Sequence, residues 1–206
     1  MSLIGIIDVG IGNIGSLSNA VYELGFEVCL IDDPELVNNC DSIILPGVGT
    51  FSHGMNAIEN ANLLESINTH IDNNKPLLGI CLGMHLLFSH GDEGGTKKGL
   101  NFIHGVVKKF KKDPLFKLPH VGWNGVEILQ QHAVLQGVKT GVDFYFVHSY
   151  RAECDSKYVI GSTDYGENFP SIVSNGSVIG MQFHPEKSQK NGLRMLENFC
   201  LWDGKC

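Results

Sequence analysis

One thiol in this sequence lies in a setting that favours nucleophilic chemistry. Cys81 stands in "GICLG" at 79–83, after an apolar run and before helical spacing over 84–88. The pattern G-x-nucleophile-x-G is typical of a sharp strand-to-helix turn, which lifts the side chain above a sheet edge. The helix behind it supplies free N–H groups and a positive dipole end, both of which favour thiolate over thiol. An inert core cysteine is the alternative, but the paired glycines favour catalysis.

A base for this thiol is available in "GMQFHPEKS" at 180–188, where an apolar strand ends at His184. Residues two apart in extended chain point to the same side, so Glu186 can accept a hydrogen bond from one imidazole nitrogen and leave the other for the sulfur. Pro185 stiffens the pairing because its φ is fixed. A strand-end histidine is more often a turn residue, yet Cys81, His184 and Glu186 together match the nucleophile, base and orienter of a triad.

Acyl transfer by such a triad also needs hydrogen-bond donors for the developing oxyanion. The turn "PGVG" at 46–49 follows the apolar run "SIIL" and can present the N–H groups of Val48 and Gly49 at the same sheet edge. Leu82, directly after the nucleophile, supplies a further N–H. The alternative for 46–49 is an ordinary glycine turn.

The elements that position these residues follow an alternating pattern in the first half of the chain. Short apolar runs ("LIGIID", "FEVCLI", "SIILPG" and "PLLGI") alternate with helical spacing over 13–24 and 55–74, which predicts βαβ units and a mostly parallel sheet with helices on both faces. After about residue 99, β-rich segments from "FIHGVVKKF" to "SVIGMQFH" predict an added antiparallel layer, and a helix over 188–201 closes the chain. We expect one α/β domain over 1–206, with the site at strand ends.

Composition narrows the class of protein. The chain has 206 residues, of which 43% are hydrophobic and 18% charged, and a formal net charge of -7. This balance argues against binding to nucleic acid. The one basic cluster, from Lys108 to Lys117, is interrupted at Asp113 and Pro114, which favours a solvated hairpin or loop. The scattered cysteines, the absence of a secretory signal and the lack of a long apolar stretch predict a soluble protein of the reducing cytoplasm without membrane association.

A glycine motif offers a different function. "GIGNIG" at 10–15 satisfies G-x-G-x-x-G after the first strand, and Asp32 and Asp33 follow the second strand. A dinucleotide-binding enzyme would place pyrophosphate at the following helix and ribose hydroxyls on an acidic residue. A lone match is weak, and a tight strand-to-helix turn explains the same glycines.

The motifs together resemble the class I glutamine amidotransferases, a family of triad glutaminases, over essentially the whole chain. The segments that carry the resemblance are "GIGNIGS" at 10–16, "LPGVGTF" at 45–51, "GICLGMHLLF" at 79–88, "LPHVGWN" at 118–124, "YFVHSY" at 145–150 and "QFHPEKS" at 182–188. Within the family, "GWN" followed by "YFVHSY" is similar to the glutaminase subunits of imidazole glycerol phosphate synthase. It separates the chain from the amidotransferases of guanine, tryptophan or carbamoyl phosphate synthesis.

This resemblance implies a flavodoxin-like fold and a reaction that hydrolyses L-glutamine to glutamate and ammonia with neither metal nor organic cofactor. Cys81 is then the nucleophile, His184 the base and acid, and Glu186 the orienter. Glu93 matches the contact for the substrate's amino group, and residues 148–150 match a backbone segment that holds its carboxylate end. The expected substrate-binding residues are His85, Glu93, His148, Ser149 and Tyr150.

The resemblance also implies a partner, a cyclase or synthase subunit that receives ammonia in a heterodimer of histidine biosynthesis. The loop around Asn13 then faces this partner and not a nucleotide. The residues expected along the partner-facing ammonia route are Asn13, Trp123, Asn124, Tyr145 and Lys187. Glutaminase activity in this family is usually weak without the partner, so we hypothesise that the donors at Val48 and Gly49 are misaligned until it docks.

Three residues depart from the family pattern. His85 stands where the family usually has a glutamine that contacts substrate, and its imidazole has a shorter reach and a pH-dependent charge. Val121 replaces a methionine and Val9 a tyrosine near the partner face. These departures keep open a paralogous glutaminase that supplies ammonia to a sugar-modifying amidotransferase. A non-catalytic regulatory subunit is a further alternative, which the intact triad disfavours.

Overall fold

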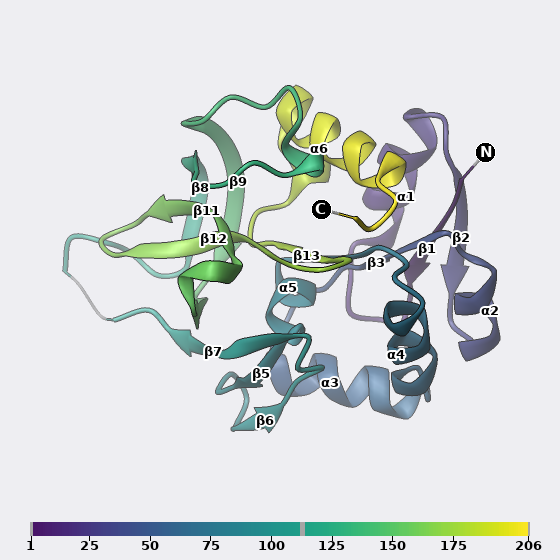
Figure 1. Ribbon diagram of the computed structural model, residues 1–206. Helices are drawn as coiled ribbons and strands as arrows, with labels where there is room; N and C mark the ends of the chain where they lie inside the picture. Colours follow the sequence, from purple (N-terminus) through teal and green to yellow (C-terminus); the bar gives the residue numbers. More distant parts are fainter. Residues whose placement is uncertain (1, 112–113, 206) are drawn as a thin grey trace.

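The computed structural model describes residues 2–111 and 114–205 (Figure 1). Its strands are β1 (Leu3–Ile7), β2 (Glu27–Ile31), β3 (Ser42–Leu45), β4 (Leu77–Ile80), β5 (Phe88–Gly91), β6 (Lys97–Lys98), β7 (Ile103–Lys109), β8 (His120–Ile128), β9 (Val142–His148), β10 (Tyr150–Cys154), β11 (Val159–Asp164), β12 (Asn168–Asn175) and β13 (Val178–Met181). Its helices are α1 (Ile14–Glu23), α2 (Pro34–Asn39), α3 (Phe51–Asn60), α4 (Leu64–Asp72), α5 (Leu82–Leu86) and α6 (Gln189–Leu201), with short 3-10 helices η1 (Ala133–Leu135), η2 (Ser156–Tyr158) and η3 (Pro185–Lys187).

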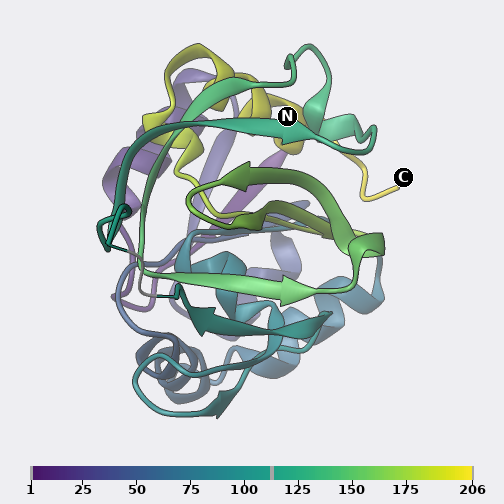
Figure 2. The same ribbon diagram turned by 90° about the vertical axis from the view of Figure 1, so that its left-hand side faces the viewer.

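A nine-stranded sheet forms the centre of the molecule, in the order β2-β1-β3-β4-β13-β12-β11-β8-β9. The pairs from β2 to β13 are parallel, and those from β13 to β9 are antiparallel. The antiparallel part faces the viewer in Figure 2 and continues the same sheet. A second sheet, β10-β7-β5-β6, lies below it in Figure 1. The predicted α/β sheet with added antiparallel strands is confirmed.

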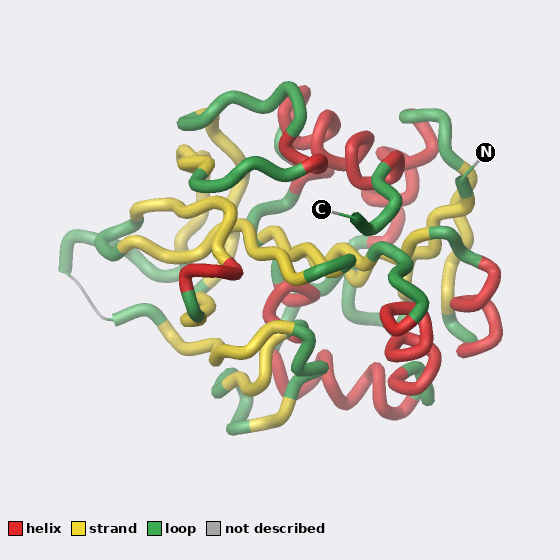
Figure 3. Tube along the Cα trace, viewed as in Figure 1, coloured by secondary structure: helices red, strands yellow, loops and turns green. Residues whose placement is uncertain are grey.

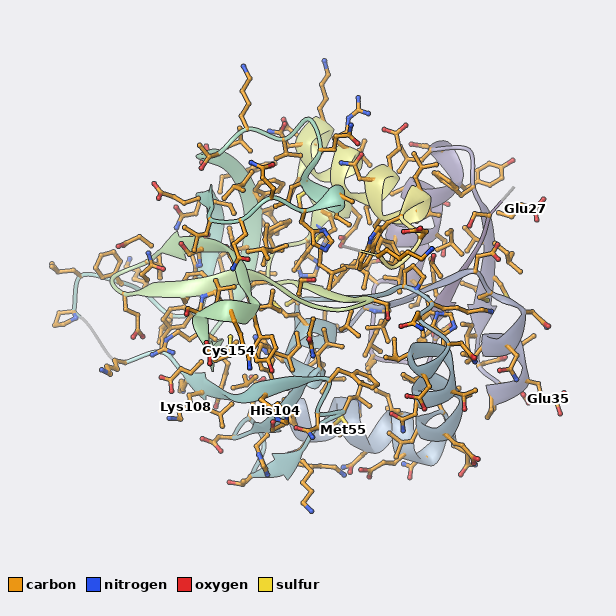
Figure 4. The ribbon with its side chains drawn as sticks, viewed as in Figure 1. Glu27, Glu35, Met55, His104, Lys108 and Cys154 are labelled. Atoms are coloured by element: carbon orange, nitrogen blue, oxygen red, sulfur yellow. The ribbon has the colours of Figure 1, made fainter. Side chains whose placement is uncertain are left out.

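Helices cover both faces of the parallel part, as Figure 3 shows in red around the yellow strands. α1 and α6 lie on one face, where Leu17 and Phe199 belong to one hydrophobic core. α3 and α4 lie on the other, where Met55 (Figure 4) and Ile67 belong to a second core. Strands β3 and β4 are buried along their whole length, which explains why "SIIL" and "LLGI" are continuous apolar runs without alternation.

The structure corrects several element boundaries. The single helix predicted over 55–74 is two helices, because Asn62 adopts a left-handed φ of 57° between α3 and α4. Helix α5 ends at Leu86, and Phe88 already begins β5. In the basic cluster, Lys108 (Figure 4) lies near the end of β7 and pairs with Glu153 at 2.8 Å. Lys112 and Asp113 of this cluster lie outside the described residues. None of the described helices has the length and apolar character required to cross a bilayer.

Four parallel neighbours, β1, β3, β4 and β13, end at one edge of the sheet. The segments that follow them are 8–13, 46–50, the turn at Cys81 and 182–188. Ligands of open α/β sheets bind beyond the carboxyl ends of such strands. The motifs found in the sequence therefore meet at this edge, although up to about 170 residues separate them along the chain.

Gly79 and Gly83 allow close packing around the turn at Cys81, although neither of them has the positive φ of this turn. The left-handed φ of 54° belongs to Cys81 itself. A Cβ on Gly83 would lie 1.7 Å from the Leu45 carbonyl oxygen, and one on Gly79 would lie 2.6 Å from the Gly83 oxygen. The glycines are required because β3, β4 and α5 approach one another without room for a side chain.

Replacing Gly83 by alanine is therefore expected to lower the free energy of unfolding by at least about 3 kcal/mol, because a backbone carbonyl cannot move aside as a flexible side chain can. Gly15→Ala is the matched control: this residue is exposed in α1 and a Cβ there meets nothing within 4 Å. The control is expected to be neutral or to stabilise the fold by up to about 1 kcal/mol. Urea unfolding measures both, and equal stabilities would contradict the packing argument.

Candidate active site

Cys81 is held at the junction of β4 and α5 in a strained conformation. Its φ of 54° and ψ of −108° are unusual for a residue with a Cβ, and such strain persists only where the surroundings enforce it. The enforcing contacts include the Cys81 N–H, which donates to the Met181 carbonyl at 2.8 Å, and the close packing of Gly79 and Gly83. The side chain is 7% exposed. The predicted sharp strand-to-helix turn at Cys81 is thus present, and the role of Cys81 as nucleophile stays a prediction.

His184 and Glu186 form the predicted pair. His184 Nδ1 lies 2.8 Å from Glu186 Oε1, and both side chains are nearly fully buried. The pairing was predicted from an extended chain, and that conformation is wrong beyond His184 because residues 185–187 form η3. A 3-10 turn brings the two side chains together instead. Because a carboxylate only accepts, Nδ1 carries a proton and Nε2 is directed toward the thiol.

Ser188 fixes His184 against the neighbouring strand. Its hydroxyl donates to the His184 carbonyl at 2.6 Å and accepts the Tyr145 N–H at 2.9 Å. The His184 N–H in turn donates to the Tyr145 carbonyl at 2.9 Å. Ser188 is 1% exposed. This serine belongs to "QFHPEKS", but no role was predicted for it; its position four residues after the base was the available signal.

The second ring nitrogen of His184 faces Cys81. Nε2 is buried and has no hydrogen bond of standard geometry within the described residues. Among the groups that raise the pKa of His184, the Cys81 sulfur has the largest effect. Burial by itself lowers the pKa of His184, but interactions with Cys81 and then Glu186 outweigh burial and raise the pKa to about 10. At neutral pH, the imidazole of His184 is therefore protonated.

A cavity of about 260 Å³ opens next to the sulfur and suits a molecule smaller than the usual drug-sized ligand. Its walls come from the ends of several strands, and they include all the residues predicted for substrate and oxyanion binding: Val48, Gly49, Leu82, His85, Glu93, His148, Ser149 and Tyr150. Burial raises the pKa of Glu93, although the Phe51 N–H and Lys109 act in the opposite direction. A larger cavity, of about 810 Å³, is lined by none of these residues.

His85 lines this cavity and is hydrogen-bonded to Gln182, for which the sequence predicted no role. Its Nε2 is 2.6 Å from Gln182 Oε1, and Gln182 Nε2 is 4.0 Å from the Cys81 sulfur. Burial lowers the pKa of His85 to about 4. The charge of His85 was expected to depend on pH, but above about pH 5 the imidazole is neutral.

The oxyanion donors are unevenly available. The Val48 N–H donates to the Ile11 carbonyl at 2.5 Å, so in this conformation it already has a partner. Gly49 has a φ of 106°, which a glycine adopts readily. Leu82 is the first residue of α5, where backbone N–H groups lack partners within the helix. The Leu82 N–H therefore has no partner within α5, and its role as an oxyanion donor stays a prediction.

His148 supports the cavity wall through a chain of hydrogen bonds. Its Nδ1 donates to the Tyr150 carbonyl at 2.8 Å, so its Nε2 accepts from His120 Nδ1 at 3.0 Å. Burial lowers the pKa of His148 to about 3 and that of His120 to about 4, so both rings are neutral. Asn124 extends the chain, with its amide 3.5 Å from His120 Nε2 and 2.8 Å from the Asp164 carbonyl. Both ring nitrogens of His148 are thus used in hydrogen bonds within the protein, and one of these bonds fixes the backbone at Tyr150.

The mouth of the site is an exposed, partly apolar face. Val48, Val121 and Trp123 are 49%, 55% and 47% exposed. Asn13 and Lys187 are also exposed, and the Tyr145 ring packs edge-on against Trp123 with centroids 6.1 Å apart. Val48 was predicted as an oxyanion donor, whereas the others were predicted to lie at or near a partner face. Asn124 differs from them, because its amide is bonded inward to Asp164 and His120.

The glycine motif at 10–15 has a structural explanation. Gly12 packs against Pro46, since a Cβ there would lie 3.1 Å from the proline ring, and the neighbouring Ile11 carbonyl holds Val48. Asp33 caps α2 by accepting the Glu35 N–H at 2.8 Å. The loop thus braces the turn at 46–49. In the described part of the chain, no group of three or more His, Cys, Asp or Glu residues is placed to hold a metal ion.

Comparison with known families agrees with this geometry. The model of the family "Glutamine amidotransferase class-I" matches residues 5–202. The chain belongs to the class I glutamine amidotransferases. Solved structures show the same fold: a putative GMP synthase protein from Thermoplasma acidophilum has a TM-score of 0.73 at 20% identity, with 97% of this chain and 92% of the other covered. PurLQS from Thermotoga maritima has a TM-score of 0.74 at 17% identity, with 97% and 98% covered.

Curated relatives of this amidotransferase match it from end to end. Imidazole glycerol phosphate synthase subunit HisH 2 of Methanococcus maripaludis is 44% identical over 199 residues, with 96% of this chain and 98% of the relative covered. Subunit HisH of Methanocaldococcus jannaschii is 46% identical over 197 residues, with 96% and 98% covered. Subunit HisH of Aquifex aeolicus is 45% identical, with 94% of each chain covered.

In this amidotransferase, Glu186→Gln is expected to lower the pKa of His184 by about one to three pH units, because removal of a neighbouring negative charge disfavours the imidazolium. NMR titration of the histidine ring resonances measures the change. The exposed His53 of α3 is the internal reference, since the substitution does not touch it. A His184 pKa that is the same in both proteins would contradict the role of Glu186.

Proposed function

We propose that this chain is the glutaminase subunit of an imidazole glycerol phosphate synthase, in which it hydrolyses L-glutamine to glutamate and passes ammonia to a cyclase subunit of histidine biosynthesis. One observation carries the proposal: a buried His184–Glu186 pair acts on the thiol of a nucleophile elbow. The relatives named HisH, at 44% to 46% identity over 94% to 96% of the chain, support this choice within the family.

The first chemical step uses the thiolate of Cys81. It attacks the side-chain carboxamide carbon of glutamine, and negative charge develops on the carbonyl oxygen. Leu82 and the turn at Val48 and Gly49 supply backbone donors for that oxygen. His184, an imidazolium in the resting pair, gives its Nε2 proton to the departing ammonia, which leaves a γ-glutamyl thioester on Cys81.

The second step regenerates the enzyme. His184, now neutral, takes a proton from water, which attacks the thioester carbon and releases glutamate. Glu186 stabilises the imidazolium each time it forms. The proton transfers of both steps involve only the triad, the substrate and water.

Substrate is oriented by the two ends of the cavity. The Glu93 carboxylate pairs with the amino group of glutamine, which compensates the burial that raises the pKa of Glu93. Backbone of residues 148–150 holds the carboxylate end, supported from behind by the His148–His120 hydrogen bond. His85 forms part of the wall between them.

The partner subunit is proposed to dock on the exposed face around the site mouth. Val48, Val121 and Trp123 supply apolar contact area, and an aromatic residue such as tryptophan is a common anchor of interfaces. Asn13, Lys187 and Tyr145 border the proposed exit for ammonia. Asn124 contributes indirectly, since its inward amide positions the strand that carries Trp123.

Docking on this face also explains why activity would depend on the partner. Val48 lies at the surface, and its N–H is held by the Ile11 carbonyl. Contact with Val48 or with the loop that contains Ile11 can break this hydrogen bond and turn the N–H toward the oxyanion. One oxyanion-hole donor is worth roughly 10²–10³-fold in kcat.

Cys81→Ala tests the division of labour. The variant is expected to lose glutamine hydrolysis while the reconstituted complex still makes product from added ammonium, because only the nitrogen source is removed. Product formation from glutamine and from ammonium is measured side by side. Loss of both reactions would contradict a purely ammonia-supplying role.

Partner dependence gives a second test. Glutamate release is measured with and without the cyclase subunit, and the rate is expected to rise by about 10²-fold or more on complex formation as the Val48 donor is realigned. Equal rates would show that the oxyanion site is complete in the isolated chain.

Supply of ammonia to a sugar-modifying amidotransferase was the alternative suggested by His85, Val121 and Val9. No observation on the structure or the relatives favours it. We also propose that residues 1–206 form one domain and that the protein is located in the cytoplasm. Complementation of a histidine auxotroph distinguishes the two pathways.

A further inference from the structure

Gln182 is a fully buried amide beside the reacting sulfur, and both ends of its side chain have partners. It is 0% exposed. Its oxygen lies 2.6 Å from His85 Nε2, and its nitrogen lies 4.0 Å from the Cys81 sulfur. A buried amide is costly unless its polar atoms are paired. The second of these partners is the nucleophile itself, so the pairing has chemical consequences.

We propose that the Gln182 carboxamide is a catalytic hydrogen-bond donor that stabilises the Cys81 thiolate, and that His85 is a positioning residue that fixes the orientation of this amide. The inference rests on the proposed role of Cys81 as nucleophile. It also assigns a function to His85, a buried residue whose ring nitrogen is bonded to this amide.

The direction of each hydrogen bond follows from the chemistry of the groups. The Gln182 oxygen can only accept, so His85 Nε2 carries the proton of the neutral ring and donates. The amide NH₂ is then directed at the sulfur. The opposite orientation would place the carbonyl oxygen against a thiolate, which is repulsive. Charge on the sulfur and the proton on His85 therefore favour the same orientation.

Three groups contact the sulfur and influence its charge. Gln182 and His184 favour the thiolate, whereas the Val147 carbonyl, 3.9 Å away, accepts a hydrogen bond from the thiol form only. Loss of the Gln182 donor would shift this balance toward the thiol. His184 would remain as the main stabilising group.

The titratable groups around the sulfur come from five parts of the fold. His184 and Glu186 follow β13, His85 belongs to α5, His148 ends β9, Tyr150 begins β10, and Glu93 lies in the loop after β5. His85 and His148 are neutral above about pH 5, because burial lowers their pKa values to about 4 and about 3. Titration of His85 and His148 therefore does not contribute to the alkylation profile above pH 5.

The test is the rate at which iodoacetamide alkylates Cys81 in the full chain, followed between pH 5 and 10 by mass spectrometry of the peptide that contains it. Gln182→Met keeps the length of the side chain and removes the donor. It is expected to slow alkylation about tenfold at pH 7 and to move the midpoint of the profile to higher pH, since hydrogen bonds to charged groups are the stronger class.

Two His85 variants form a matched pair that does not depend on the folding of Gln182→Met. His85→Leu removes the donor to Gln182 and is expected to slow alkylation about threefold in the same direction, because the amide is no longer oriented. His85→Gln provides an N–H again and is expected to recover most of that loss. A purely structural role for His85 would not give rescue in the pH midpoint.

The possible results separate this inference from the proposed function. If Cys81 of the unmodified protein showed no reactive form below the ordinary thiol range, the role of Cys81 as nucleophile would be wrong. If that form were present and both Gln182→Met and His85→Leu kept the unmodified profile, only the assignment of Gln182 and His85 would be overturned. Because iodoacetamide is neutral and needs no glutamine site, altered substrate binding does not affect the result.

Discussion

One backbone hydrogen bond joins the two halves of the catalytic site. The Cys81 N–H donates to the Met181 carbonyl at 2.8 Å, at the point where the parallel strands β4 and β13 both end. The bond fixes the elbow relative to the segment that carries His184, although about a hundred residues lie between them. The strained φ of Cys81 and the tight packing of Gly79 and Gly83 follow from this arrangement, because the chain must turn at once into α5 without leaving the neighbouring strand.

The buried histidines of the site fall into two groups that differ in the direction of their pKa shift. His85, His120 and His148 are buried, and a carboxylate raises the pKa of none of them. Their pKa values therefore fall to about 4 or below, and they act as neutral donors and acceptors. His184 is also buried, but Cys81 and Glu186 raise its pKa to about 10. The same burial thus produces opposite charge states, and the neighbouring groups decide which histidine exchanges protons during catalysis.

Much of this site could be predicted from the sequence, because its chemistry is local in the chain. The elbow around Cys81 and the His184–Glu186 pair are short patterns, and alternating strands and helices placed them at one sheet edge. The interaction of Ile11 with Val48 and that of His85 with Gln182 could not be predicted, since each joins segments whose approach depends on the packed fold. The break at Asn62 was missed for a different reason: apolar spacing continues on both sides of one left-handed residue.

The most direct measurement of the central claim is covalent labelling with an electrophilic chloroketone analogue of glutamine, followed by digestion and mass spectrometry. Cys40, Cys154 and Cys200 are internal controls, because burial raises their thiol pKa values to about 12, 11 and 12 and leaves little thiolate at neutral pH. The account predicts a single label, on Cys81, that glutamine prevents and that is strongly reduced in His184→Ala. A label on another cysteine, or a Cys81 label that is insensitive to both glutamine and His184, would contradict it.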